Sequence, residues 1–202
     1  MLFVEHPWIN PQTIEQRDYQ TAIVDTAVRG NTLVVIPTGL GKTSIGVLVA
    51  AERLSKNWNA HILVMAPTKP LVNQHMKVFE KSIKDGLTMN VITGQTNPED
   101  REVLYKKTQV VFSTPQTIAN DLKKGTISLA DFSLCIIDEA HRCVGNYAYV
   151  YVAKTYMQQA RDSLILALTA SPGSTKEYIN NVKEKLFIDY VEIRARENED
   201  VL

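Results

Sequence analysis

The stretch Thr32-Leu-Val-Val-Ile-Pro-Thr-Gly-Leu-Gly-Lys-Thr43 joins a short apolar run to a glycine-rich turn. The run at 32–37 is rich in β-branched residues, which is typical of a buried strand in a parallel sheet. Gly39 and Gly41 then permit a tight turn, and a helix that opens at Lys42 directs free backbone N–H groups into it. The stretch therefore predicts a strand–turn–helix unit with a phosphate-binding loop.

The same alternation of apolar runs and helical patterns continues along the chain. We expect strands at 32–37, 61–67, 89–94, 109–114, 134–138, 164–169 and 189–194, and helices at 13–29, 42–56, 69–84, 98–107, 115–124, 146–160 and 174–185. This order predicts an α/β fold, a mostly parallel sheet of about seven strands flanked by helices on both faces. Ligands of such sheets bind at the carboxyl ends of the strands. Asn146 and Ser174 are expected helix N-caps, and Gly30 and Gly125 are expected helix stops.

The glycine-rich turn contains the residues that a nucleotide phosphate requires. Lys42 would reach the β- and γ-phosphates, and the hydroxyl of Thr43 would bind Mg²⁺. The strict P-loop pattern places a further glycine where this chain has Ile36, so that pattern fails at one position. The alternative is a chance Gly-Lys-Thr sequence in an ordinary strand–helix turn.

A second candidate group follows the apolar run at 134–137. Asp138 and Glu139 are adjacent carboxylates at the predicted carboxyl end of a strand. Asp138 would hold Mg²⁺, and Glu139 would orient and deprotonate an attacking water. The pair makes a chance phosphate loop less plausible, because both halves of a hydrolysis site are present in one chain.

Composition limits the function without choosing it. The chain has 202 residues, with 22 Lys and Arg against 22 Asp and Glu, so any nucleic-acid contact must be local. Two cysteines, Cys135 and Cys143, argue against a disulfide framework, and with His141 they lack a fourth ligand for a structural metal site. The N-terminal segment has no signal-peptide core, and no apolar run is long enough to span a membrane, so we expect no membrane partner.

Four further segments turn this general ATP-binding pattern into a more specific one. They are Arg17-Asp-Tyr-Gln20, Ala66-Pro-Thr-Lys-Pro-Leu-Val-Asn-Gln-His75, Ser113-Thr-Pro-Gln-Thr117 and Thr169-Ala-Ser-Pro172. With PTGLGKT at 37–43 and DEAH at 138–141, this ordered set resembles the N-terminal RecA-like domain of superfamily 2 DEAH-type helicases. The motif wording is similar to that of archaeal Hef and Fanconi anaemia M-type helicases, and the Dicer and RIG-I group is the nearest competitor.

The resemblance implies a role for each matching residue. The cofactors would be ATP and Mg²⁺, with Lys42, Asp138 and Glu139 as the catalytic residues. ATP would be bound by Arg17, Gln20, Thr38, Gly39, Leu40, Gly41, Lys42 and Thr43, and Mg²⁺ by Thr43 and Asp138. Nucleic acid would be bound by Pro67, Thr68, Lys69, Gly94, Gln95, Thr114, Pro115 and Thr117. The two sites would be coupled by His141, Thr169 and Ser171, with the histidine as the link between them.

The implied function is that of a motor domain in an ATP-dependent helicase or translocase. Residues 1–196 would form its first RecA-like domain, and 197–202 would begin a linker to a second RecA-like domain in the same full-length chain. The expected partner is nucleic acid, with branched or forked DNA favoured, and the isolated domain is expected to be weakly active or inactive. An archaeal protein would be cytoplasmic and a eukaryotic one nuclear. The alternatives are an ATP-switched sensor of double-stranded RNA, a Dicer-like motor module and a metabolic kinase.

Two aromatic features allow two interpretations each. Tyr147, Tyr149, Tyr151 and Tyr156 could stack on bases, although helical aromatics at such spacing more often pack against a sheet, and we favour packing. Trp8 could cover the adenine or anchor the N-terminal arm.

Overall fold

The computed structural model describes residues 2–170, 176–198 and 201. The described residues form strands β1 Thr32–Val35, β2 His61–Met65, β3 Met89–Val91, β4 Val110–Ser113, β5 Phe132–Ile137, β6 Ile165–Thr169 and β7 Tyr190–Ile193. The helices are α1 Asp18–Ala27, α2 Lys42–Lys56, α3 Lys69–Ser82, α4 Pro98–Lys107, α5 Pro115–Lys124, α6 Tyr147–Gln159 and α7 Lys176–Lys185, with a 3₁₀ turn η1 at Ala140–Cys143. All seven expected strands and all seven expected helices are therefore confirmed, apart from their exact ends.

The seven strands form one sheet in the order β3-β4-β2-β5-β6-β1-β7, and every neighbouring pair is parallel. Parallel neighbours require a crossover between them, and in this chain each crossover contains a helix. The central strands are buried apart from the half-buried His61 at the start of β2, whereas the two edge strands β3 and β7 are only partly covered. The predicted α/β class with a mostly parallel sheet is confirmed.

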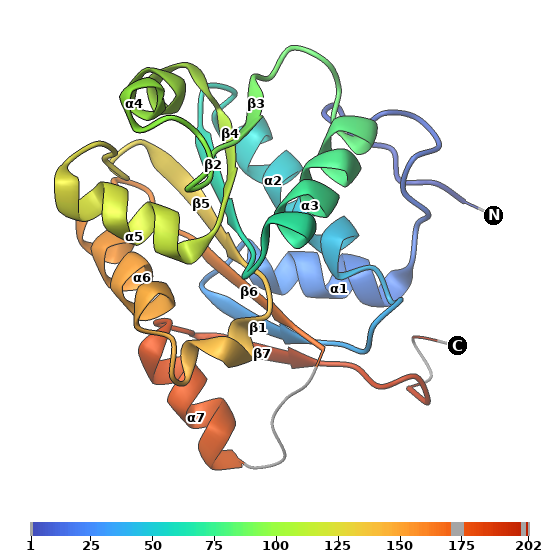
Figure 1. Cartoon of the computed structure of the whole chain (residues 1–202). Helices are drawn as coiled ribbons and strands as arrows, with labels where there is room; N and C mark the ends of the chain where they lie inside the picture. The colour runs from blue at the N-terminus through green and yellow to red at the C-terminus, as the bar shows by residue number, and fades with distance from the viewer. Residues whose placement is uncertain (1, 171–175, 199–200, 202) are drawn as a thin grey trace.

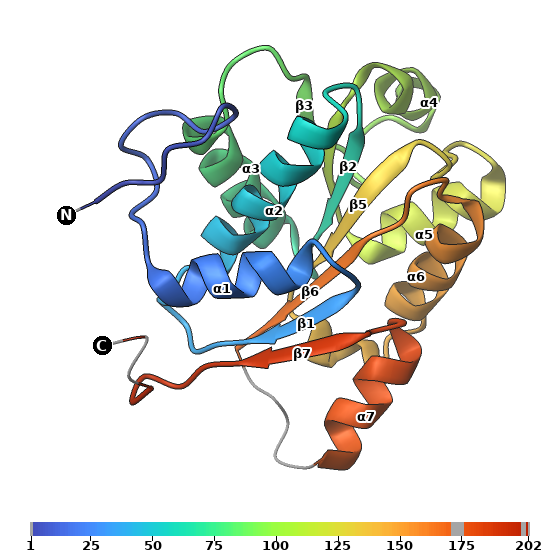
Figure 2. The same cartoon turned by 180° about the vertical axis from the view of Figure 1, so that it is seen from behind.

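Helices cover both faces of the sheet, as Figures 1 and 2 show. Helices α1, α2 and α3 pack on one face, and α4, α5, α6 and α7 pack on the other. Alternate residues of a strand serve the two faces, so Val34 packs toward the first group of helices while Leu33 and Val35 pack toward the second. Two apolar cores therefore hold the sheet rigidly and fix the loops at its carboxyl edge.

The first helix is shorter than expected. It begins at Asp18, because the segment before it pairs as an extended chain, with a bridge between Phe3 and Glu15 and a hydrogen bond from the Val4 N–H to the Ile14 carbonyl. The helix is capped at Val28, two residues before the expected stop at Gly30. The hydrophobic pattern of a helix cannot show where pairing with a distant segment ends that helix.

The other expected helix ends have separate outcomes. Asn146 is confirmed as the N-cap of α6, because its side chain accepts a hydrogen bond from the Ala148 N–H. Gly125 is confirmed as the stop of α5 and has the left-handed φ of 72° that favours glycine. Ser174 lies outside the described residues.

The aromatic residues divide into two groups. Tyr149 and Tyr156 of α6 are fully buried in the core, which confirms packing for these two. Tyr147 on the same helix is 70% exposed. Trp8 packs against the core on the α1–α3 face and its carbonyl accepts a hydrogen bond from the Lys84 N–H, so it anchors the N-terminal arm. Among the described residues, no helix is long and apolar enough to cross a membrane.

Candidate nucleotide site and nucleic-acid face

The turn after β1 has the backbone of a phosphate loop. Gly39 and Gly41 have φ values of 88° and 78°, in the left-handed region that side chains rarely adopt, and Gly41 is the N-cap of α2. A Cβ atom at Gly41 would lie 2.4 Å from the Gln20 side-chain nitrogen, so a larger residue cannot fit without displacing it. The Lys42 ammonium donates to the Ile36 carbonyl at 3.3 Å and thereby folds back over the turn.

The acidic pair follows β5 at the same edge of the sheet. The Asp138 carboxylate is nearly buried and accepts hydrogen bonds from the Glu139 N–H at 2.9 Å and from the His75 Nε2 at 2.7 Å. The Tyr149 hydroxyl donates to the Asp138 carbonyl at 2.9 Å. Glu139 has φ of 52°, an uncommon value for a residue with a side chain, which turns the chain sharply at the end of the strand. These contacts hold the pair in one orientation.

The phosphate loop and the acidic pair line one cavity of about 350 Å³. Its walls are Thr38, Gly39, Gly41, Lys42, Thr43, Leu71, Gln74, His75, Asp138 and Glu139. Partial burial lowers the pKa of the Lys42 ammonium, and the nearby carboxylates of Asp138 and Glu139 act in the opposite direction. The cavity thus combines a cation for phosphate oxygens with carboxylates for a metal and a water.

A third group of contacts ties the segment at 17–20 to the phosphate loop. The Leu40 carbonyl accepts hydrogen bonds from the Tyr19 hydroxyl at 2.7 Å and from the Gln20 side-chain nitrogen at 3.1 Å. Arg17 donates to the Tyr19 hydroxyl and to the Glu15 carboxylate. Among the described residues, the buried side-chain oxygen of Gln20 has no hydrogen-bond partner. An unpaired buried acceptor beside the phosphate loop suits the amino group of an adenine.

The residues also fit a magnesium ion. Thr43 and Asp138 bring a hydroxyl and a carboxylate to the same cavity, and Mg²⁺ is commonly held by one or two such protein oxygens together with substrate phosphates. The described residues contain no cluster of three His, Cys, Asp or Glu that could hold a metal without a ligand. The carboxylate of Asp138 is aimed by the His75 imidazole, which lies on the neighbouring helix α3.

One histidine joins the acidic pair to the end of β6. His141 Nδ1 lies 2.9 Å from the Thr169 hydroxyl and 3.3 Å from the Glu139 carboxylate. The Tyr178 hydroxyl donates to the His141 carbonyl and fixes the turn from the side of α7. The structure thus brings together two of the three residues expected to couple the sites, and Ser171 lies outside the described residues.

The residues expected to face nucleic acid form a contiguous surface next to this cavity. Lys69 donates to the Gln95 side chain, and the hydroxyls of Thr114 and Thr117 lie 2.9 Å apart. A Cβ atom at Gly94 would lie 4.0 Å from the Thr117 hydroxyl, which places the three segments side by side. Thr68, Lys69, Gly94 and Gln95 are exposed, Pro67 and Thr114 are half-buried, and Pro115 and Thr117 are buried. Thr68, Lys69, Gln95 and Thr114 can therefore present polar side chains, whereas Pro115 and Thr117 shape the surface from below.

Sequence reasoning gave no role to four residues whose side chains make hydrogen bonds that hold the site together. They are Tyr19 and Tyr149, whose hydroxyls bind backbone carbonyls of the site, Arg196, which donates to the Thr38 carbonyl at 2.8 Å, and His75. A signal existed for His75, because Leu71, Gln74 and His75 share one helix face and all three line the cavity. No local pattern identified the other three.

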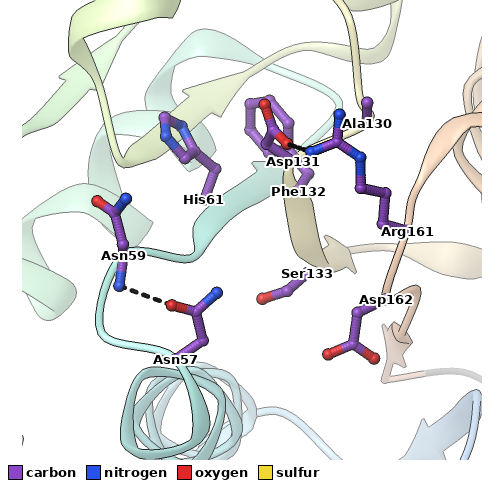
Figure 3. Close-up of a pocket in the computed structure, with 9 residues that line it drawn as sticks. All are labelled: Asn57, Asn59, His61, Ala130, Asp131, Phe132, Ser133, Arg161 and Asp162. Atoms are coloured by element: carbon purple, nitrogen blue, oxygen red, sulfur yellow. Dashed lines mark hydrogen bonds and ion pairs between the residues drawn. The ribbon is translucent and has the colours of Figure 1, made fainter.

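A second cavity, also of about 350 Å³, lies at the opposite, amino-terminal edge of the sheet (Figure 3). In Figure 3 the Asp131 carboxylate faces Arg161, which donates to it at 2.6 Å. Asp162 is paired with Arg53 and Lys56 at 2.9 and 3.2 Å. The two carboxylates of this second cavity are therefore already neutralised by neighbouring cations. Every segment with an expected role lies at the other edge of the sheet.

Comparison with known proteins agrees with this geometry. The family model for the DEAD/DEAH box helicase matches residues 17–179. A Methanocaldococcus jannaschii protein that is named as an ATP-dependent RNA helicase is 42% identical over 201 residues, which are 99% of this chain and 25% of that protein. The ATP-dependent DNA helicase fml1 of Schizosaccharomyces pombe is 41% identical over 196 residues, which are 96% of this chain and 23% of that protein.

A solved helicase structure has the same fold as this chain. The helicase domain of Pyrococcus furiosus Hef superimposes with a TM-score of 0.90 at 44% identity, covering 96% of this chain and 41% of that one. This chain therefore spans about a quarter of the two curated relatives and less than half of the solved domain. The resemblance stated from the motifs is confirmed, including its Hef-like and Fanconi M-type character. The chain belongs to the DEAD/DEAH box helicase family.

Proposed function

We propose that this chain is the first motor domain of an ATP-dependent DNA helicase or translocase whose full-length form acts on branched or forked DNA. One observation carries the proposal: the Lys42 ammonium and the Asp138–Glu139 carboxylates line a single cavity at the carboxyl edge of the sheet. A nucleotide triphosphate needs a cation and a metal-binding carboxylate on its phosphates, together with a base for the water that attacks it.

Each group of residues around the cavity would have a separate role in ATP hydrolysis. The backbone N–H groups that follow Gly39 and Gly41, together with Lys42, would hold the phosphates, and the unpaired oxygen of Gln20 would accept a hydrogen bond from the adenine amino group. Thr43 and Asp138 would hold Mg²⁺, which neutralises phosphate charge when bound. Glu139 would orient the water and take its proton.

The coupling to nucleic acid would run through His141. Its imidazole contacts both the Glu139 carboxylate and the Thr169 hydroxyl, so a displacement of Thr169 at the end of β6 would alter the position of the base. The surface around Lys69, Gln95 and Thr114 would bind the phosphates of one strand through a charge and polar groups. Strand binding and hydrolysis would then influence each other through one short chain of side chains.

The full-length protein would supply what this domain does not contain. The relatives are about four times longer, which leaves room for a second RecA-like domain that closes on the bound nucleotide. Arginines from a facing domain stabilise the charge on the transferring phosphoryl group and are worth roughly 10³–10⁵ in rate. We therefore expect the 202-residue chain alone to hydrolyse ATP very slowly and to unwind no DNA.

The decisive experiment measures ATPase stimulation in the full-length protein. Forked DNA, single-stranded DNA and duplex RNA are compared, with Lys42→Ala as the control for contaminating ATPases. The proposal expects the greatest stimulation by forked DNA and none in the control. Equal or greater stimulation by duplex RNA would favour an RNA motor and contradict the DNA assignment, which the names of the relatives leave divided between DNA and RNA.

A further inference from the structure

The outer surface of α5 and α6 carries a pair of tyrosines, the exposed Tyr147 and the half-buried Tyr151, with a lysine above it. The rings of Tyr147 and Tyr151 are stacked at 29° with their centroids 6.0 Å apart. The Lys123 ammonium lies 5.3 Å from the first centroid and 4.9 Å from the second. Tyr147 is 70% exposed although its helix neighbours Tyr149 and Tyr156 are fully buried, so packing against the sheet does not account for it.

The exposed charges of this surface are all positive. The chain as a whole has equal numbers of acidic and basic residues, yet no Asp or Glu occurs between Glu139 and Asp162. Helix α5 has a single carboxylate, Asp121, which is 1% exposed and bound to Arg101 and Tyr105 on α4. The exposed charges on α5, η1 and α6 are therefore all positive, namely Lys123, Lys124, Arg142 and Lys154.

The surface is also continuous with the proposed nucleic-acid face. A shallow hollow of about 480 Å³ runs between the two helices, and its lining includes Gln116, Asn120, Lys123 and Tyr147. Gln116 is exposed in the first turn of α5, which begins directly after the half-buried Thr114 of that face. A strand that leaves the face over α5 would therefore meet the hollow next.

We propose that this surface is a platform that extends the nucleic-acid path beyond the strand-binding face. An unpaired base stacks on Tyr147, and a phosphate pairs with Lys123. The platform consists of Gln116, Asn120, Lys123, Tyr147 and Tyr151. The proposal rests on the proposed function, because it extends the same strand-binding face. Aromatic rings stack on bases of any sequence, and a neighbouring cation strengthens the contact with the backbone. The amides of Gln116 and Asn120 line the hollow and offer both donors and acceptors to the sugar and the phosphate.

The test separates stacking from other contacts by changing both the protein and the DNA. Binding of a fluorescein-labelled single-stranded oligonucleotide is measured at low salt by anisotropy, for this 202-residue chain and for its Tyr147→Leu, Tyr147→Phe and Tyr190→Leu variants. Tyr190 is the matched control, because it is 42% exposed and has the Arg29 guanidinium 5.9 Å from its ring, but it lies on the edge strand β7. The same titrations are repeated with an abasic oligonucleotide of equal length.

Stacking predicts a specific pattern. Tyr147→Leu should raise Kd about 10-fold for the normal oligonucleotide and should leave Kd for the abasic one unchanged. Tyr147→Phe and Tyr190→Leu should bind like the parent. Lys123→Gln should lower the slope of log Kd against log salt by about 0.7, the value for one phosphate of a single strand. Thermal unfolding of each variant confirms that the protein remains folded.

The remaining outcomes each overturn a different statement. If Lys69→Gln weakens binding while Tyr147→Leu does not, the proposed strand-binding face stands and the platform is wrong. An equal loss on normal and abasic DNA would show that Tyr147 does not stack on a base and would overturn the platform too. If the parent chain binds no oligonucleotide even at low salt, the platform is overturned together with the strand-binding face of this domain, whereas the proposed function is decided separately by the ATPase test on the full-length protein.

Discussion

His75 donates a hydrogen bond from Nε2 to the Asp138 carboxylate at 2.7 Å, and both side chains are at least nine-tenths buried. The two residues are 63 positions apart and belong to α3 and to the end of β5. An ionised carboxylate only accepts hydrogen bonds, so the imidazole must carry the hydrogen on this nitrogen. The contact fixes one oxygen of the carboxylate that we assign to Mg²⁺.

His75→Ala should destabilise the fold and weaken Mg-ATP binding together. The change leaves a buried acceptor without a partner, which costs roughly 1–3 kcal/mol of unfolding free energy. Urea unfolding and calorimetry with Mg-ATP measure the two effects. His75→Gln should recover part of both, and His61→Ala, at the other edge of the sheet, should leave ATP affinity unchanged. Unaltered Mg-ATP affinity in His75→Ala would show that the contact does not position the metal site.

Lys42→Ala should abolish productive ATP binding and leave the fold intact. Lys42 begins α2, and within the part of the chain that the structure describes its ammonium donates to the Ile36 carbonyl alone, so its removal disturbs no packing. Among the described residues that line the cavity, it is also the one lysine or arginine. Calorimetry on the full-length parent and variant checks the affinity, with circular dichroism as the control for folding. Parent-like affinity and turnover in the variant would refute the phosphate site.

Glu139→Gln should separate binding from hydrolysis. The amide keeps the shape of the side chain but cannot accept a proton, and loss of a general base typically slows a reaction by about 10²-fold or more. The full-length variant should bind Mg-ATP with unchanged affinity and turn it over slowly in a steady-state ATPase assay. Hydrolysis at the parent rate would mean that another group is the base.

Gly41→Ala should be more damaging than Gly125→Ala, although both glycines have a left-handed φ of 70–80°. A left-handed backbone costs roughly 1–2 kcal/mol for a residue with a side chain, and this cost is common to both variants. A Cβ atom at Gly125 meets open space, whereas one at Gly41 would lie 2.4 Å from Gln20. Urea unfolding should show the larger loss for Gly41→Ala, and only that variant should lose ATP affinity. Equal losses would indicate that the Gln20 contact is unimportant.

Neither cysteine should react with alkylating reagents in the native protein at pH 8. Burial raises the pKa of the Cys135 thiol to about 12 and that of the Cys143 thiol to about 11. The thiolate is the reactive form, and roughly one part in 10³ or less of either thiol is ionised at pH 8. Mass spectrometry after iodoacetamide treatment should find modification only in denatured protein. Rapid labelling of the native chain would show that this part of the core opens easily.

Most of the fold could be predicted from local pattern. The apolar runs at 32–37 and 134–137 became the buried strands β1 and β5, because a strand covered on both faces needs apolar side chains throughout. The motif residues then had to gather at one edge of the sheet, since the carboxyl ends of parallel strands lie together. Lys42, Asp138 and Glu139 meet in one cavity for this reason. The start of α1 was misplaced, because pairing between Phe3 and Glu15 overrides the helical pattern there.

The sequence by itself therefore determined the class of the fold, the order of its elements and the chemistry at the ends of its strands, all of which depend on residues near one another in the chain. Only the tertiary structure decided which distant groups touch. It placed β1 between β6 and β7, His75 against Asp138, and Tyr147 in solvent while Tyr149 is buried. Strand order and burial depend on the whole set of packing contacts, and no periodic pattern along a helix or a strand records which neighbour will cover it.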